Sequence, residues 1–334
     1  MSNIKKFLVL GSNSFSGASF INYLIKQPDV NLVIGVSRSD EPDAAFLPYK
    51  QDKNENNKFI FRKLNLNTHT LEILETIKQY KVTHIVNFAA QGMVAQSWEN
   101  PEQWIQTNVL SLSYLLKELH KIDHIESFVQ ASTPEVYGVC DNVQESFNYM
   151  PSTPYAASKA AADGLLHSYY KTHGLPVRYT RAANVYGSGQ QLYRIIPKTI
   201  ITILKEEKLF LHGGGASVRS FIHINDVSDA TYKISCSGCN GEIYHVSGTE
   251  LVSIKDLVFT ICNLMNASPD KFVVESEQRT GTDSLYLLNA DKMKRELNWE
   301  PEVSLNQGLN ETISWVKTNY EFLRNIPSEY IHKE

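Results

Sequence analysis

The feature that most constrains this chain is the regular alternation of short β-branched runs with longer helical patterns in its first half. Most of the runs read as continuous apolar stretches, which is typical of parallel strands covered on both faces. Strand–helix alternation at this spacing builds βαβ units. The sequence therefore predicts an α/β fold with a doubly wound parallel sheet. Strands are expected at Phe7–Leu10, Leu32–Val36, Phe59–Leu64, His84–Phe88, Ser127–Ala131 and Val177–Ala182, and helices at Gly17–Lys26, Thr70–Tyr80, Glu102–Lys121 and Tyr155–Thr172.

A glycine-containing turn joins the first expected strand to the first expected helix. It reads Gly11-Ser-Asn-Ser-Phe-Ser-Gly17. Gly11 allows a tight turn and Gly17 allows close helix–strand packing, while the helix N-terminus offers N–H groups to a pyrophosphate. The middle position of such turns, usually Gly, is Ser14 here. The turn predicts a Rossmann-type dinucleotide site, with an ordinary strand–helix turn as the alternative.

The residues after the second expected strand indicate which dinucleotide is bound. An acidic residue there favours NAD, whereas Arg accommodates the 2′-phosphate of NADP. The chain has Ser37 and Arg38 at this point, and its first carboxylates are Asp40 and Glu41. We therefore expect NADP in preference to NAD, with a solvated surface charge as the alternative interpretation of Arg38.

The pattern becomes richer in loops after Asn184. Glycines cluster at Gly213–Gly215, and shorter helices are expected at Ile195–Lys205, Ser253–Met265 and Ser304–Tyr320. We expect residues 1–184 to form the dinucleotide-binding Rossmann domain. Residues 185–330 are expected to form mainly a smaller C-terminal α/β substrate domain, partly interleaved with the first.

Composition excludes several other classes of protein. The 334 residues contain 32 Lys and Arg against 36 Asp and Glu, which gives a net charge of −4. The basic residues are dispersed, so no nucleic-acid partner is expected. No apolar run is long enough to span a membrane, the N-terminus lacks signal-peptide features, and four cysteines make no disulfide framework. A soluble cytoplasmic enzyme is expected.

A tyrosine and a lysine lie four residues apart in the helix expected at 155–172. The segment Tyr155-Ala-Ala-Ser-Lys159 places both side chains on one helical face. A phenol with a pKa near about 10 is a poor base at neutral pH, but a neighbouring ammonium favours the phenolate. Tyr155 could then take a proton from a sugar hydroxyl while hydride leaves for the cofactor. A surface helix pair is the alternative interpretation.

With these motifs in place, the chain resembles the extended short-chain dehydrogenase/reductase family, whose members act on nucleotide sugars. The resemblance spans nearly the whole chain in the family's order. The matching segments are Gly11 to Gly17, Asn87–Ala90, Asn100-Pro101 with Thr107-Asn108, Ser132–Gly138, Tyr155 with Lys159, Arg181–Gly187, Arg219–Asp226 and Arg279–Asp283.

The resemblance implies roles for individual residues. Tyr155 and Lys159 would be the catalytic pair, assisted by Thr133. Gln91, Asn184, Arg219 and Arg279 match positions that contact the nucleotide-sugar substrate, and Arg suits a diphosphate by its charge and bidentate geometry. Structural ion pairs are the alternative for the two arginines. Cofactor contacts are implied for Gly11, Ser14, Phe15, Gly17, Ser37, Arg38, Asn65, Leu66, Ala89, Ala90 and Asn108, together with Tyr155 and Lys159.

Glu135 indicates which reaction is expected. In the family's 4,6-dehydratases, the segment after the catalytic Thr carries an acid/base pair, usually Asp-Glu, whose Glu removes the C5 proton of a 4-keto sugar. This chain has Thr133-Pro134-Glu135, so the base is present and the acid is replaced by Pro134. Glu135 itself or a water would then protonate the C6 hydroxyl. We predict a nucleotide-diphosphate-hexose 4,6-dehydratase that forms a 4-keto-6-deoxy sugar nucleotide.

Two other functions remain open at this stage. A nucleotide-sugar 4-epimerase or 4-keto reductase would use Tyr155 without elimination, and Glu135 would then merely cap the end of a strand. A catalytically silent NADP-binding protein is the second alternative. Cys236 and Cys239 lack the further ligands of a zinc site, so no metal is expected. By family resemblance we expect a homodimer formed through the helices at 102–121 and 155–172.

Overall fold

The computed structural model describes residues 4–51, 58–276 and 286–333. The strands are β1 (Lys5–Leu10), β2 (Val30–Ser37), β3 (Phe59–Lys63), β4 (His84–Asn87), β5 (Ser127–Ala131), β6 (Cys140–Val143), β7 (Val177–Ala182), β8 (Asn184–Tyr186), β9 (Leu209–His212), β10 (Val218–His223), β11 (Ile243–Val246), β12 (Leu251–Ser253), β13 (Val273–Ser276) and β14 (Tyr286–Leu288). The helices are α1 (Phe15–Leu24), α2 (Pro48–Gln51), α3 (Thr70–Tyr80), α4 (Pro101–Ile105), α5 (Ser111–Leu119), α6 (Pro154–His173), α7 (Ile195–Leu204), α8 (Ile224–Ser237), α9 (Ile254–Leu264), α10 (Pro269–Phe272), α11 (Asp291–Leu297), α12 (Leu305–Thr318) and α13 (Tyr320–Leu323).

The main sheet confirms the predicted doubly wound architecture. Its strand order is β11-β7-β5-β4-β1-β2-β3, and all its strand pairs are parallel. The chain leaves β1 for β2 on one side and later returns to β4 on the other. The order therefore reverses at β1, and such a switch point is where open α/β sheets bind ligands, at the carboxyl ends of the strands. The six strands expected from the sequence all lie in this sheet.

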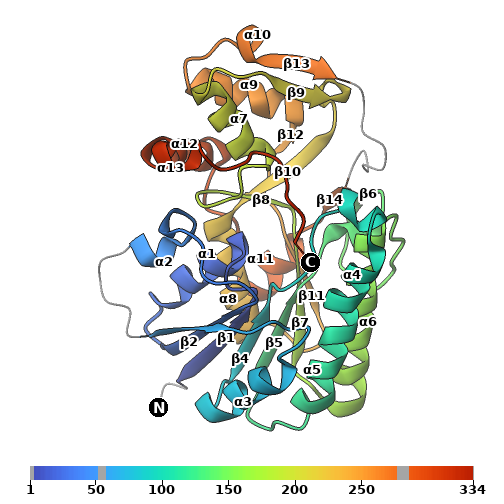
Figure 1. Cartoon of the computed structure of the whole chain (residues 1–334). Coiled ribbons are helices and arrows are strands. Elements are labelled where there is room, and N and C mark those ends of the chain that lie inside the picture. The colour runs from blue at the N-terminus through green and yellow to red at the C-terminus, as the bar shows by residue number, and fades with distance from the viewer. Residues whose placement is uncertain (1–3, 52–57, 277–285, 334) are drawn as a thin grey trace.

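Alternating side chains of β1 show how the sheet is covered on both faces. Phe7 and Val9 pack into one core with α1 and α8, while Leu8 and Leu10 pack into the opposite core with α3, α5 and α6. All four side chains are at most 1% exposed. Figure 1 shows α5 and α6 on one side of the sheet and α1 and α8 on the other. The continuous apolar runs of the sequence are therefore explained by burial on both faces.

The helix predicted over Glu102–Lys121 is not continuous. The structure divides it into α4, a π-helical turn over Gln106–Leu110 and α5. Single π turns inside helices are frequent at functional sites. Here the turn contains the buried Asn108. The apolar spacing could not show this turn, because one inserted residue barely changes the pattern.

The second half of the chain adds a smaller body at one end of the sheet (Figure 1). Its core is formed mainly by α7, α9 and α12, with strands β9 and β13 paired beside it. Strands β8, β10 and β12 form a separate three-stranded sheet. Segment 224–246 returns to the first body, because α8 packs on α1 and β11 pairs with β7. The main sheet is thus completed by residues beyond position 184.

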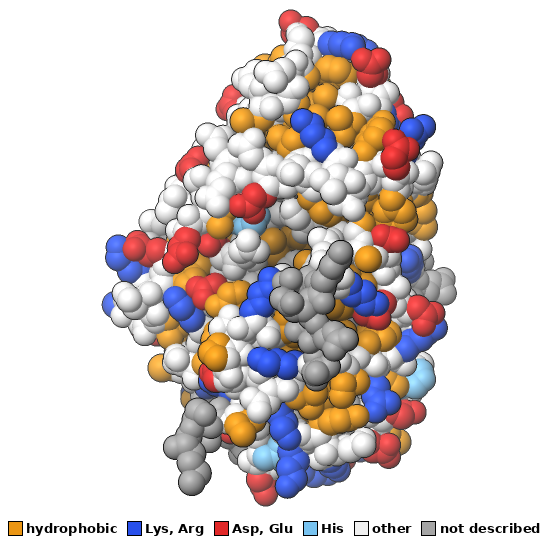
Figure 2. Space-filling view, turned by 90° about the vertical axis from the view of Figure 1, so that its left-hand side faces the viewer, with side chains coloured by type: hydrophobic (Ala, Val, Ile, Leu, Met, Phe, Trp, Pro, Cys, Tyr) orange, Lys and Arg blue, Asp and Glu red, His pale blue; other side chains and the backbone are white. Residues whose placement is uncertain are grey.

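The described surface is mixed in charge. Figure 2 shows acidic and basic side chains interspersed with apolar ones over the face it views. Among residues 4–51, 58–276 and 286–333, no helix combines the length and apolar character that a membrane span requires.

Candidate active site

The glycine turn lies at the carboxyl end of β1, at the switch point of the sheet. Gly11 has φ +81°, and a Cβ built on it would lie 2.6 Å from the backbone nitrogen of Ala89. A Cβ on Gly17 would lie 2.2 Å from the carbonyl oxygen of Gly11. Both positions therefore exclude any side chain, as a turn that brings α1 close to β1 requires.

Ser14 closes the turn without needing a glycine's freedom. It is the N-cap of α1 with φ −73°, and its Oγ accepts from the N–H of Gly17 at 3.0 Å. The same hydroxyl donates to the carbonyl of Gly11 at 2.7 Å. Phe15 begins the helix and is 9% exposed. The departure from a three-glycine pattern is explained, because position 14 lies in an ordinary extended conformation that Ser adopts readily.

Asn13 is a residue of the turn that the sequence analysis missed. Its side-chain amide donates to the carbonyls of Ser39 and Asp40, each at 2.9 Å. This ties the glycine turn to the loop that follows β2. The loop contains Arg38, which comes directly after Ser37, the last residue of β2. Asn is common in turns, so its presence at position 13 did not indicate this role.

Asn65 and Leu66, two of the residues with implied cofactor contacts, directly follow strand β3 and the residue after it. The Asn65 side chain accepts from the N–H of Asn67 at 2.9 Å, so it shapes the loop between β3 and α3. Leu66 is buried at 7% exposure. Both residues thus lie at the carboxyl end of β3, the strand next to β2.

The segment after β4 is held by Asn108. The Oδ1 of Asn108 accepts from the N–H of Gln91 at 2.9 Å, and its Nδ2 donates to the Gln91 carbonyl at 3.1 Å and to the Ser158 hydroxyl at 2.8 Å. Ala89 and Ala90 precede Gln91 directly. The π turn therefore fixes this segment against helix α6. Ser158, the third partner, was not singled out from the sequence.

Helix α6 carries Tyr155 and Lys159 one turn apart. Its first turn is fixed by the N-cap Thr153, and the N–H of Tyr155 donates to Ser97 Oγ at 3.2 Å. Lys159 is 3% exposed, and its Nζ donates to the carbonyl of Ala131, the last residue of β5, at 2.6 Å. This bond anchors α6 to the carboxyl edge of the sheet. Tyr155 is half-buried.

Two carboxylates act on the charge of the Lys159 ammonium. Burial lowers the pKa of its ammonium to about 8, while the negative charges of Asp163 and Glu135 act in the opposite direction. The 3-10 turn that bears Glu135 packs against helix α6, which carries Lys159. The structure thus places in one region two residues that are 24 positions apart in the chain.

Thr133 and Glu135 lie on a short 3-10 turn that follows β5. Thr133 is its N-cap, 4% exposed, and Pro134 occupies the first position of the turn, which tolerates a missing N–H. Glu135 is half-buried. Pro134 thus has a clear structural place, and it offers no proton at the position where the resemblance implied an acid.

A buried ion pair holds this turn against α6. Asp163 and Arg181 meet at 3.0 Å with both side chains fully buried, and Asp163 also accepts from the Ser132 hydroxyl at 2.6 Å. The Arg181 guanidinium lies 4.6 and 4.9 Å from the ring centroids of Tyr137 and Tyr149. Breaking a buried pair typically costs about 3–5 kcal/mol, so Thr133, next to Ser132, is held firmly. Asp163, four residues after Lys159, was missed in the sequence.

The substrate residues expected in the second half are only partly described. Asn184 and Arg219 lie on the neighbouring strands β8 and β10, and Asn184 Nδ2 donates to the carbonyl of Ser220 at 3.1 Å. Arg219 is 9% exposed and donates to the carbonyl of Val218 at 2.8 Å. Arg279 lies outside the described residues.

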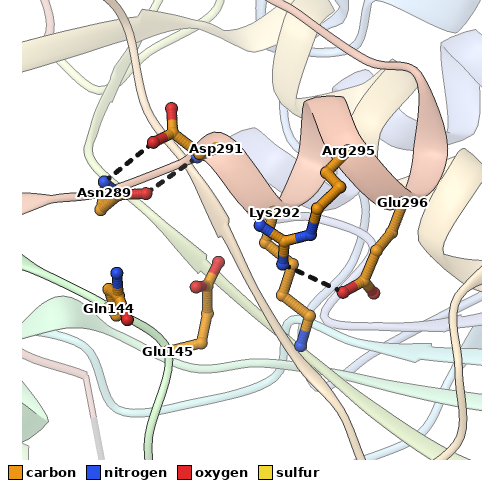
Figure 3. Close-up of a pocket in the computed structure, with 7 residues that line it drawn as sticks. All are labelled: Gln144, Glu145, Asn289, Asp291, Lys292, Arg295 and Glu296. Atoms are coloured by element: carbon orange, nitrogen blue, oxygen red, sulfur yellow. Dashed lines mark hydrogen bonds and ion pairs between the residues drawn. The ribbon is translucent and has the colours of Figure 1, made fainter.

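A cavity of about 290 Å³ lies elsewhere on the molecule. Figure 3 shows Lys292, Arg295 and other α11 residues on one side and Gln144 and Glu145 on the other. Its charges are largely paired within the protein, since Lys292 bonds to Glu242 at 2.6 Å and Arg295 to Glu296 at 3.3 Å. None of the predicted site residues that the structure describes lines this cavity. It is therefore not the candidate active site.

The parallel sheet, the glycine turn at its switch point and the Tyr155–Lys159 helix define the short-chain dehydrogenase/reductase class. Comparison with known proteins narrows this class. The chain belongs to the GDP-mannose 4,6-dehydratase family, whose model matches residues 8–312.

Individual relatives agree with this assignment. The chain is 29% identical over 349 aligned positions to the dTDP-glucose 4,6-dehydratase of Salmonella typhimurium, with 97% of this chain and 96% of the relative covered. It is 32% identical to the dTDP-glucose 4,6-dehydratase of Xanthomonas campestris over 76% of this chain and 78% of the relative. A crystal structure of DesIV, the dTDP-glucose 4,6-dehydratase of Streptomyces venezuelae, with NAD and TYD bound, matches with a TM-score of 0.86 at 29% identity and covers 95% of this chain and 98% of that one.

Proposed function

We propose that this protein is a nucleotide-diphosphate-hexose 4,6-dehydratase. The observation that carries the proposal is the packing of the 3-10 turn Pro134–Tyr137, which bears the carboxylate base Glu135, against helix α6, which bears Tyr155 and Lys159. Tyr155 and Lys159 without a carboxylate base would serve an epimerase equally well. The two cited dTDP-glucose 4,6-dehydratases, which align over three quarters or more of the chain, support the same conclusion.

The proposed reaction has an oxidation step and an elimination step, and different residues perform each of them. Tyr155, favoured as phenolate by the Lys159 ammonium, takes the proton of the C4 hydroxyl, and Thr133 donates a hydrogen bond to the C4 oxygen. Glu135 removes the C5 proton, which the new C4 carbonyl has made acidic. Because Pro134 has no proton, Glu135 also returns its proton to the departing C6 hydroxyl. As hydride is returned to C6, C5 takes up a proton from solvent, and Tyr155 releases to solvent the proton of the C4 hydroxyl. The products are water and a 4-keto-6-deoxy sugar nucleotide.

NAD is the dinucleotide we propose for this site. When bound, it accepts the hydride from C4 and returns it to C6, so the reaction needs no net oxidant. A pyrophosphate suits this turn, because Gly11 and Gly17 have no side chains to block its approach to the backbone. The N-terminus of α1 offers N–H groups to the same pyrophosphate. Support for NAD comes from DesIV, which was solved with NAD bound. The NADP preference expected from Ser37 and Arg38 gains no support from the comparisons.

Asn184, Arg219 and Gln91 are proposed to hold the substrate, with Arg279 as a further candidate. The relatives make dTDP-glucose the first sugar nucleotide to test. The cytoplasm remains the expected compartment, because dinucleotides and nucleotide sugars are cytoplasmic metabolites.

The test is mass spectrometry of the product formed in D₂O. The purified protein is incubated with NAD and one sugar nucleotide at a time. The sugar nucleotides are dTDP-glucose, GDP-glucose, UDP-glucose, CDP-glucose and GDP-mannose. We expect one substrate to lose one water and to gain one deuterium at C5. A changed sugar without water loss and without deuterium would contradict the proposal and indicate an epimerase. No turnover of any sugar would leave a silent binding protein.

The pH dependence should report the charge of Lys159. Its pKa of about 8 means that the ammonium is present below this value and is lost as the pH rises through it. We therefore expect kcat/KM to fall above about pH 8. In Lys159→Arg, which stays charged, the remaining activity should lack this fall. The same alkaline fall in both proteins would show that another group titrates.

A homodimer is proposed through α4 and α5 together with α6. Ile105, Leu110 and Tyr114 are 47%, 38% and 52% exposed, so a row of apolar side chains faces outward at about helical spacing. Light scattering should give twice the chain mass, and Tyr114→Glu combined with Ile105→Glu should give a monomer. Leu71→Glu serves as the control, because Leu71 is an exposed residue of α3, outside the proposed interface. A monomeric wild-type protein would contradict the proposal.

A further inference from the structure

The segment after α13 crosses from the smaller body to the carboxyl edge of the main sheet. Figure 1 shows it as the red trace that runs from α12 and α13 to the C label beside the ends of the strands. We call residues 327–333 the strap. The strap contains no regular helix or strand, and its side chains are half-buried or exposed.

The strap is anchored on α4 by His332. The imidazole stacks on the indole of Trp104 with ring centroids 5.4 Å apart and an interplanar angle of 7°. Its Nε2 also lies 2.5 Å from Gln103 Oε1. Trp104 is fully buried, so the anchor rests on a fixed surface.

The last described carbonyl of the strap joins two residues of the candidate site. The carbonyl of Lys333 accepts from Arg38 and from Gln91 Nε2, each at 2.9 Å. Arg38 follows β2 and Gln91 follows β4, and these strands flank β1 on its two sides. The strap therefore passes across the switch point, beyond the end of the strand that carries the glycine turn.

The other end of the strap is tied to the smaller body. The Glu329 carboxylate pairs with Lys198 of α7 at 2.6 Å. The ring of Tyr330 packs edge-on against Tyr193 with centroids 5.2 Å apart. The strap thus links both bodies of the molecule over the candidate site.

The strap leaves the glycine turn itself open. Within the described part of the chain, the hydrogen bonds of residues 327–333 reach Arg38, Gln91, Gln103 and Lys198 but no residue of the turn 11–17. Its contacts to the first body are a few hydrogen bonds and one ring stack. A segment held by so few contacts can open locally without unfolding the protein.

We propose that the strap is a clasp that closes over the bound dinucleotide and slows its release. The inference rests on the proposed function, in which the hydride taken from C4 must return to C6 of the same sugar. A dinucleotide that left between these steps would abort the turnover. The strap bridges the two ends of the expected dinucleotide path, Arg38 at the ribose side and Gln91 at the sugar side, which suits it to retain the molecule.

The test measures release of NAD in the absence of any sugar nucleotide. Full-length protein is loaded with isotopically labelled NAD and chased with unlabelled NAD. His332→Ala removes the ring stack and the hydrogen bond, and should release NAD about tenfold faster, which corresponds to about 1.4 kcal/mol. Gln103→Ala weakens the same anchor from the other side and should act in the same direction. Ile331→Ala, in the same segment but 64% exposed, is the matched control and should release NAD at the wild-type rate.

The outcomes separate the clasp from the proposed function. Unchanged release in both His332→Ala and Gln103→Ala would overturn the clasp, even if the wild-type protein dehydrates sugars. Tighter NAD binding in these variants would also overturn it, because the strap would then compete with the dinucleotide. A protein that retains NAD through the strap but dehydrates no sugar would overturn the proposed function alone. A wild-type protein that binds no NAD would overturn both.

Discussion

Glu135→Gln should stop elimination while leaving oxidation at C4 intact. The amide cannot accept the C5 proton, so we expect loss of water to slow by about 10³-fold, within the range of general acid–base catalysis. The substitution keeps the size of a half-buried side chain, so the fold should be preserved. Because oxidation continues, reduced nicotinamide should accumulate and be seen by its near-ultraviolet absorbance.

The matched control for this variant is Asp141→Asn. Asp141 lies in the neighbouring strand β6 with an exposed side chain, and the change removes one negative charge without touching the turn at Thr133. It should dehydrate at the wild-type rate. If Glu135→Gln still incorporates deuterium at C5 at close to the wild-type rate, Glu135 is not the base and a water or another side chain performs this step.

Tyr155→Phe should block the reaction one step earlier, at the oxidation of C4. Without the phenol, no group is placed to take the C4 hydroxyl proton, and we expect a loss of about 10³- to 10⁴-fold in turnover. In contrast to Glu135→Gln, reduced nicotinamide should not accumulate on adding substrate. Binding of the sugar nucleotide should change little, as titration calorimetry can measure.

Tyr169→Phe is the control on the same helix. Tyr169 lies in α6, and its ring packs against His120 and His173 rather than toward the sheet edge. Removing its hydroxyl should leave turnover unchanged. Accumulation of reduced nicotinamide in Tyr155→Phe would contradict the assignment, since oxidation would then proceed through another base.

The sequence predicted the main sheet well because its central strands, such as β1, are apolar on both faces. The expected Ser127–Ala131 and Val177–Ala182 match β5 and β7 to the residue. The glycine turn was predictable for a similar reason, since the close approach of Gly11 to Ala89 leaves no room for a side chain. Local patterns succeed where a single residue type satisfies a local steric demand.

Long-range contacts were beyond such patterns. The pairing of Asp163 with Arg181 joins a helix to a strand 18 residues later, and no local pattern shows which side chains will pair over that separation. The strap could not be predicted from the sequence either, because its hydrogen bonds with Arg38 and Gln91 join residues that are 295 and 242 positions apart. Arg38 was therefore interpreted from its place after β2 alone, without the strap carbonyl that it binds.

The late arrival of β11 in the main sheet has a consequence for synthesis. Until residues 243–246 leave the ribosome, β7 remains an open edge strand with unpaired N–H and C=O groups. The smaller body cannot supply this partner, because its strands pair among themselves. The nascent chain must therefore keep β7 from pairing with other chains over more than 60 residues of translation. Arg178 of that strand bonds the carbonyls of Ser235 and Gly238 only after these residues are made, and until then its positive charge discourages association of the open edge with a second copy.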